Sequence, residues 1–260
     1  MALPKTYVDG FHGADKINEV FGFKNADKIP KMEYKTFNHV NLEISKLVVN
    51  GTTFSCVFGD LEDEEAIPTL KLALMFGVNY IHSAPYEYYD RFEEVAGKVL
   101  KEVPRSAYYI STKVGKYSKP NTFSYDYDFT GEKTRHSVEK SLRDLGIQYI
   151  DIVFIEGFES ITNHDIIFEE TLPALEALKS EGKIGIIGLS NDVQKHNMEM
   201  FKEVLGRGRG RFQMVSFFDY KIKDDDWEDL SNFTNEQGLD LVGTSPCSLP
   251  YKIRGVQVKE

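Results

Sequence analysis

The sequence predicts an α/β fold in which short buried strands alternate with amphipathic helices around a parallel sheet closed into a barrel. The stretch 172–191 shows the pattern most completely and reads LPALEALKSEGKIGIIGLSN. Apolar residues first recur at helical spacing, Gly182 then offers a left-handed cap, and residues 184–189 form a short apolar run. Such a run is typical of a strand buried on both faces. Ser190 and Asn191 follow at its carboxyl end, where α/β barrels place their functional groups.

The same alternation extends along most of the chain. Strands separated by helices at this rhythm indicate a parallel sheet closed into a barrel. We expect a hairpin and a first strand over 34–49, further strands over 78–81, 108–114, 149–155, 184–189, 212–218 and 239–244, and helices over 64–76, 93–101, 132–145, 166–181, 193–205 and 226–237. By pattern alone, the stretch 172–191 also fits any other α/β unit in which the Ser-Asn pair forms a turn.

Composition narrows the classes of protein to which the chain can belong. Its 260 residues are enough for one large domain with a substantial core. No apolar run approaches the roughly 18 residues of a membrane helix, and the first residues lack the apolar centre of a signal peptide. Two cysteines, Cys56 and Cys247, give no disulfide framework, so we expect a cytoplasmic protein. The net charge of −10 disfavours nucleic acid as a partner, and neither nucleic acid nor membrane is expected to bind.

Two stretches fall outside the predicted barrel elements. Residues 1–31 are expected to form an N-terminal arm, mostly coil with one short helix over 15–21, which packs on the surface or binds a partner. Residues 32–260 are expected to form the barrel domain. Residues 206–211, which read GRGRGR, are expected to be a flexible solvated turn between a helix and the next strand.

Several motifs together resemble those of the aldo-keto reductase family. The segment EGKI…IGLSN resembles the family's fifth barrel strand, and RHSVEKSLRDLGIQYID resembles the helix that precedes its fourth strand. The matching stretches are 32–58, 77–85, 97–100, 135–151 and 172–191. The resemblance extends over about 32–249 and points to the galactose/aldose 1-dehydrogenase-like branch. It implies a TIM-type (β/α) barrel of the aldo-keto reductase kind.

The resemblance also implies hydride transfer between NADP and a carbonyl or sugar carbon, supported by four catalytic positions. The family has an Asp after the second strand, a Tyr five residues later, a Lys after the third strand and a His after the fourth. In the family the Tyr donates the proton and the His orients the carbonyl. The Lys is held by the Asp and lowers the pKa of the Tyr. Aligned without gaps, these positions are His82, Glu87, Lys113 and Glu156. Only Lys113 keeps the family's residue, so we expect lost or much altered activity, as in a pseudoenzyme or scaffold.

The altered positions leave other interpretations open. Glu87 could donate a proton only if burial or the nearby Glu156 raised its pKa, whereas Lys113 would lower it. An active NAD(P)-dependent oxidoreductase with a displaced donor, Tyr86, is an alternative, as is enone reduction, because one branch of the family carries Glu at the His position but keeps its Tyr. His82, Glu87 and Glu156 have the ligand types of a metal site, but a lysine in the same pocket argues against one. In the simplest case the charges only pair, Lys113 with Glu156 or Glu87.

Cofactor and partner expectations follow from the same resemblance. Ser190 and Asn191 would hold the nicotinamide carboxamide, and Ser245 lies in a loop that follows the pyrophosphate in relatives. Only ten residues follow Pro250, so we expect a barrel that lacks most of its last βα unit and binds NADP weakly or not at all. Residues 253–258 are expected to close the sheet as a short strand; otherwise the N-terminal arm, a second copy of the chain or another protein covers the edge.

Overall fold

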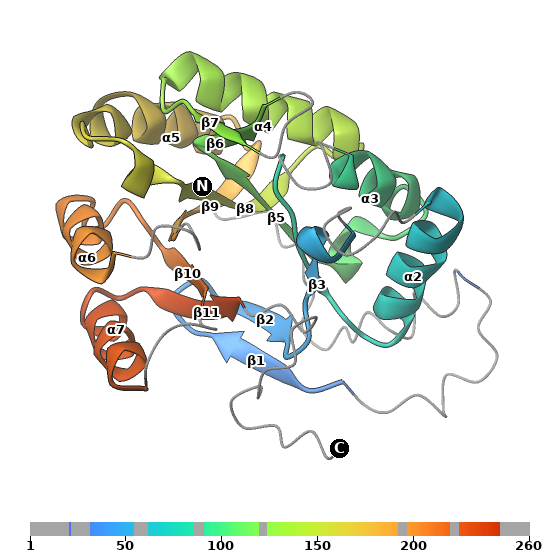
Figure 1. Ribbon diagram of the computed structural model, residues 1–260. Coiled ribbons are helices and arrows are strands. Elements are labelled where there is room, and N and C mark those ends of the chain that lie inside the picture. Colours follow the sequence, from blue (N-terminus) through green and yellow to red (C-terminus); the bar gives the residue numbers. More distant parts are fainter. Residues whose placement is uncertain are drawn as a thin grey trace.

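The fold is built around one parallel sheet. The computed structural model describes residues 21, 32–54, 62–85, 91–119, 124–191, 197–218 and 224–244. Within them, seven parallel strands pair in the order β3–β4–β5–β8–β9–β10–β11. They are β3 (Val49–Asn50), β4 (Tyr80–His82), β5 (Tyr109–Val114), β8 (Ile150–Glu156), β9 (Ile184–Ser190), β10 (Met214–Phe218) and β11 (Asp240–Thr244). The strands curl, and the helices lie along their outer side (Figure 1), as expected for a TIM-type fold.

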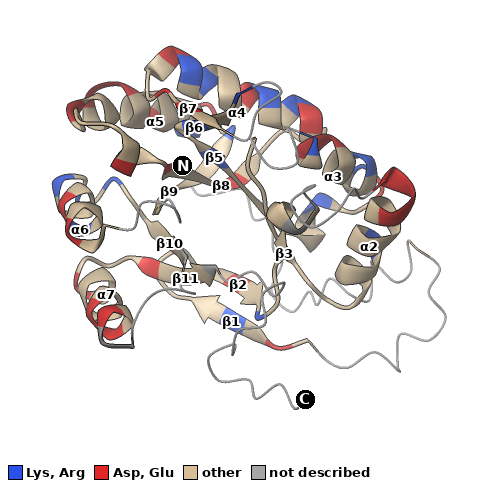
Figure 2. Cartoon of the chain, viewed as in Figure 1, with Lys and Arg blue, Asp and Glu red and all other residues tan. Residues whose placement is uncertain are grey.

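Six α-helices of the described chain connect and cover these strands. They are α2 (Asp63–Met75), α3 (Phe92–Leu100), α4 (Gly131–Leu145), α5 (Leu172–Ser180), α6 (Met198–Arg207) and α7 (Asp224–Glu236), with short helical turns η2 (Gly51–Phe54), η4 (Arg105–Ala107), η5 (Phe158–Ser160) and the π-helical η6 (Ile167–Thr171). Figure 2 shows that charged residues concentrate on the helices and that the strands are mostly uncharged. No helix in the described part of the chain combines the length and hydropathy of a membrane-crossing segment.

The inner side of the sheet is filled by side chains and by an antiparallel hairpin. This hairpin consists of β1 (Tyr34–Phe37) and β2 (Leu42–Ser45). The apolar side chains that pack together here come from the hairpin and from the strands: Phe37, Val40, Leu42, Ile44, Tyr80, Tyr109, Ile152, Phe154, Ile186, Met214 and Val242. This packing fills the interior on the hairpin side with apolar side chains.

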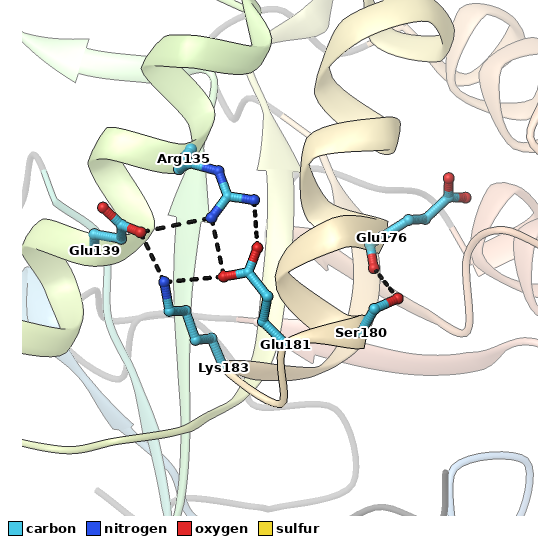
Figure 3. Close-up of polar contacts among 6 residues, drawn as sticks. All are labelled: Arg135, Glu139, Glu176, Ser180, Glu181 and Lys183. Atoms are coloured by element: carbon cyan, nitrogen blue, oxygen red, sulfur yellow. Dashed lines mark hydrogen bonds and ion pairs between the residues drawn. The ribbon is translucent and has the colours of Figure 1, made fainter.

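An exposed ion network ties α4 to the start of β9 (Figure 3). Arg135 Nη2 lies 2.7 Å from Glu181 Oε1, and Lys183 Nζ lies 2.8 Å from Glu139 Oε1. Hydrogen bonds from Arg135 first, and from Lys183 second, lower the pKa of Glu181 to about 2. A lowered carboxyl pKa stabilises the fold above the unfolded pKa, and the effect is lost as the pH falls toward 2. Because all four side chains are solvated, the contribution is small and sensitive to salt.

The structure differs from the sequence prediction in three elements. An antiparallel pair that was not predicted, β6 (Lys116–Ser118) and β7 (Tyr125–Tyr127), follows β5. The helix expected over 166–181 begins as the π-helical η6, where the Thr171 hydroxyl donates to the Phe129 carbonyl. The flexible turn expected over 206–211 is also wrong in part. Helix α6 extends to Arg207, and Arg211 forms an ion pair of two hydrogen bonds with Glu176. In this segment Arg207 also pairs with the Asp165 carboxylate.

Candidate active site

Buried polar side chains collect where the parallel strands end. His82 ends β4, Lys113 lies near the end of β5, Glu156 ends β8 and Ser190 ends β9. All four are buried. Glu156 and Ser190 are register partners on neighbouring strands. The structure therefore brings four of the predicted site residues to one edge of the sheet, whereas Glu87 and Ser245 lie outside the described residues.

Lys113 and Glu156 form an ion pair away from solvent. The Lys113 Nζ lies 2.6 Å from Glu156 Oε2, and the two side chains are only 11% and 5% exposed. At this separation the opposite charges offset part of the cost of burying each other. This is one of the two pairings that the sequence left open for Lys113.

A second lysine also faces Glu156, and sequence reasoning missed it. Lys116 Nζ lies 3.7 Å from Glu156 Oε1 and 4.2 Å from the centre of the Tyr125 ring. Both Lys116 and Tyr125 belong to the unpredicted β6–β7 hairpin. The sequence does carry one signal, a glycine (Gly115) directly after the predicted strand. In the structure this glycine has a φ of 101° and turns the chain after β5. Each carboxylate oxygen of Glu156 therefore faces its own ammonium group, which favours the ionised carboxylate.

His82 is bound to neutral hydroxyl groups. Its Nδ1 lies 2.9 Å from the Ser111 Oγ, and the Tyr80 hydroxyl donates to the same oxygen at 2.8 Å. Burial first, and the positive charge of Lys113 second, hold the pKa of His82 well below its usual value of 6.5. The ring is therefore neutral at physiological pH. His82 occupies the end of β4, and among the described contacts the carboxylate that holds Lys113 is that of Glu156 at the end of β8.

This lowered pKa predicts a pH dependence of stability. The unfolded chain binds a proton at His82 as the pH falls through 6.5, and the folded chain does not, so acid favours unfolding. We expect the free energy of unfolding to fall by up to about 1.4 kcal/mol per pH unit below this point, and His82→Gln to remove that slope. Urea unfolding of both proteins at several pH values measures it. Identical slopes would show that His82 is not buried in its neutral form.

The carboxyl ends of β9 and β10 supply a second group of polar side chains. Ser190 and Asn191 are each 4% exposed, and the Asn191 backbone N–H donates to the Ser216 carbonyl at 3.3 Å. Ser216 is the register partner of Ser190, and its buried hydroxyl has no hydrogen-bond partner within the described part of the chain. Sequence reasoning missed Ser216 because it lies inside the apolar strand FQMVSFF. A buried hydroxyl without a partner is costly, so it favours a ligand group at this position.

The described residues give no support to the metal interpretation. No group of three or more His, Cys, Asp or Glu side chains among residues 32–54, 62–85, 91–119, 124–191, 197–218 and 224–244 is arranged to hold a metal ion. His82 and Glu156 instead have the partners described above, and Glu87 is outside these ranges.

Comparison with known proteins places this chain in a family. The profile of the Aldo/keto reductase family matches residues 48–248. L-galactose dehydrogenase of Arabidopsis thaliana is 31% identical over 226 residues, which cover 84% of this chain and 66% of that protein. D-arabinose 1-dehydrogenase of Saccharomyces cerevisiae is 34% identical over 154 residues, covering 56% of this chain and 43% of that protein. The chain thus spans less than two thirds of the length of each of these relatives.

A solved structure supports the fold. The holo form of aldo-keto reductase AKR11C1 from Bacillus halodurans superposes with a TM-score of 0.66 at 24% identity, covering 82% of this chain and 65% of that one. At this identity the likeness concerns the fold alone. Together with the family profile and the sugar dehydrogenase relatives, it shows that this chain belongs to the aldo/keto reductase family.

Proposed function

We propose that this chain is an aldo-keto reductase-type protein that binds a nicotinamide cofactor and a small carbonyl or sugar ligand, and that its ordinary carbonyl reduction is lost or much altered. The observation that carries the proposal is the buried Lys113–Glu156 pair at 2.6 Å. The family's lysine is retained, but its carboxylate partner now comes from the strand that carries the family's histidine. His82 stands on the strand that carries the family's aspartate, so the acid and the histidine have exchanged strands.

This exchange changes what the site can do with a proton. Glu156 faces Lys113 and Lys116, so it is an ionised acceptor and a poor proton donor. His82 is neutral and hydrogen-bonded to Ser111, which removes the negative charge at the end of β4. Lys113 remains at the edge of the sheet, where its Nζ contacts Glu156. Efficient reduction needs a proton donor whose pKa is matched to the working pH, and a carboxylate that faces two lysines does not supply one.

The cofactor part of the proposal rests on the ends of β9 and β10. A nicotinamide carboxamide carries both donors and an acceptor, which suits Ser190, Asn191 and the partnerless hydroxyl of Ser216. When bound, the nicotinamide ring would supply or accept the hydride. The residues here would fix one end of it beside Glu156, the register partner of Ser190. NADP as the preferred form, and weak affinity for it, remain predictions.

A second candidate is an active oxidoreductase with a different proton donor. The retained lysine favours it, because Lys113 lies at the strand edge and can donate to an oxyanion formed there. Its substrate would be a sugar, a carbonyl compound or an enone. Glu87 and Tyr86, the other candidate donors, lie outside the described residues.

Turnover and cofactor binding test these two candidates. We expect oxidation of aldoses and reduction of simple aldehydes to be at least about 100-fold slower than in the Arabidopsis L-galactose dehydrogenase, the loss expected without a matched proton donor. The variant His82→Asp/Glu87→Tyr/Glu156→His, which restores the family's residues, should recover part of that rate. Titration of NADPH and NADP⁺, followed by Trp227 fluorescence, measures binding separately. Turnover by the unchanged protein at the rate of the reference enzyme would favour the second candidate.

A further inference from the structure

A second hollow lies outside the candidate active site. It is bounded by the β6–β7 hairpin, the first turn of α4 and the segment that follows η5, and the hairpin runs beside α4 in Figure 1. Its volume is about 990 Å³, at the upper end of the range for small-molecule pockets. Its lining includes none of the candidate site residues that the structure describes. A ligand here would therefore contact different side chains from those around Lys113 and Glu156.

The charged groups of this hollow already have partners. The Lys133 ammonium lies 4.5 Å from the centre of the Tyr117 ring, where it makes a cation–π contact. Asp126 pairs with Lys119 at 3.0 Å. Asp128 accepts hydrogen bonds from the backbone N–H and the hydroxyl of Thr130, at 2.9 and 2.7 Å. An anionic or cationic ligand would have to displace one of these contacts, so the lining favours a neutral ligand.

The remaining groups favour a ligand with many hydroxyls. The Ser160 hydroxyl is buried and has no hydrogen-bond partner among the described residues, and Thr162 is exposed at the rim. Carboxylates such as Asp126 can accept further hydrogen bonds because each oxygen has two lone pairs. Tyr117 and Tyr127 add aromatic surface to the lining. Aromatic rings beside hydroxyl donors and carboxylate acceptors suit the apolar C–H faces and hydroxyl edges of a sugar.

We propose that this hollow is a binding site for a neutral saccharide, separate from the proposed hydride-transfer site. The proposal goes beyond the proposed function and does not depend on it, because no residue of one site is used by the other. The site binds a sugar without cofactor and without chemistry. It selects neutral sugars over amino sugars and sugar acids of the same size.

The test is saccharide binding to the full chain without cofactor. Saturation-transfer NMR and calorimetry with D-glucose, L-galactose and D-xylose should show binding, and D-glucosamine and D-glucuronate should bind at least about tenfold more weakly. Ser160→Ala, which removes the partnerless hydroxyl with little change in volume, should weaken binding by about threefold or more, the loss of one hydrogen bond. Thr162→Trp, which places a large ring at the rim, should abolish it.

Two control variants make the result decisive. Ser180→Ala removes a hydroxyl at the far end of α5, where Ser180 donates to the Glu176 carbonyl (Figure 3), and should leave binding unchanged. Lys113→Met alters the hydride-transfer site and should also leave it unchanged, so failure of the proposed function does not affect this test. No neutral sugar bound at tens of millimolar, or unchanged binding by Thr162→Trp, would overturn the proposal. Loss of binding in Lys113→Met would assign the sugar to the strand edge and overturn it as well.

Discussion

Replacing Glu156 with glutamine is expected to lower the free energy of unfolding by about 3–5 kcal/mol, the usual cost of removing one member of a buried ion pair. The substitution keeps the size of the side chain but removes the charge that faces Lys113 at 2.6 Å and Lys116 at 3.7 Å. Both lysines are buried, so water cannot replace the carboxylate without a rearrangement of the hairpin. Urea unfolding monitored by circular dichroism measures the loss.

The matched control is the same substitution at Glu139. This glutamate also faces two cations, Lys183 at 2.8 Å and Arg135 at 3.6 Å, but its side chain is 36% exposed. Glu139→Gln should therefore cost less than about 1 kcal/mol, as for other solvated pairs. The double variant Lys113→Met/Glu156→Gln should lose less than Glu156→Gln alone, because one unmatched charge is removed. Equal losses at the two glutamates would show that the cluster at the strand edge is solvated.

Replacing Gly115 with alanine is expected to cost about 3 kcal/mol, from backbone strain and from overpacking together. Gly115 connects β5 to the hairpin with a φ of 101°, a backbone conformation that residues other than glycine rarely adopt. A Cβ at this position would lie 2.7 Å from the Glu156 carbonyl oxygen and would also clash with the Phe129 ring. Because Lys113 and Lys116 lie on either side of Gly115, the same change should also disturb both contacts to Glu156.

Gly146→Ala separates strain from overpacking. Gly146 ends α4 with a φ of 66°, but a Cβ there meets no atom within 4 Å. This change should cost only about 1 kcal/mol, the strain of a left-handed residue. Chemical denaturation compares the two variants under one condition. If Gly115→Ala lowers the free energy of unfolding no more than Gly146→Ala does, the turn after β5 has room for a side chain. The short distance between a Cβ at position 115 and the Glu156 carbonyl oxygen is then wrong.

Much of the architecture followed from local pattern. The stretch 172–191 was expected to contain a helix, a left-handed glycine and a buried strand, and the structure has α5, Gly182 with a φ of 75° and β9. The strand signal is strong here because both faces of β9 are buried, so its apolar run stands out. The β6–β7 hairpin was missed because each strand has only three residues and carries polar side chains, which gives no such run. The residues that it contributes, Lys116 and Tyr125, were missed for the same reason.

The sequence by itself determined the family and the alternation of strands and helices, because each depends on residues close together in the chain. Only the tertiary structure decided the partners of the candidate site residues. It pairs Lys113 with Glu156, 43 positions later in the numbering, places His82 with Ser111, and adds Lys116 to the same carboxylate. Such partners depend on strand register and on the angle at which a hairpin folds back, and neither is encoded by local periodicity. The electrostatic state of the site is therefore set by contacts between distant segments, and one of the residues that set it, Lys116, was not predicted from the sequence.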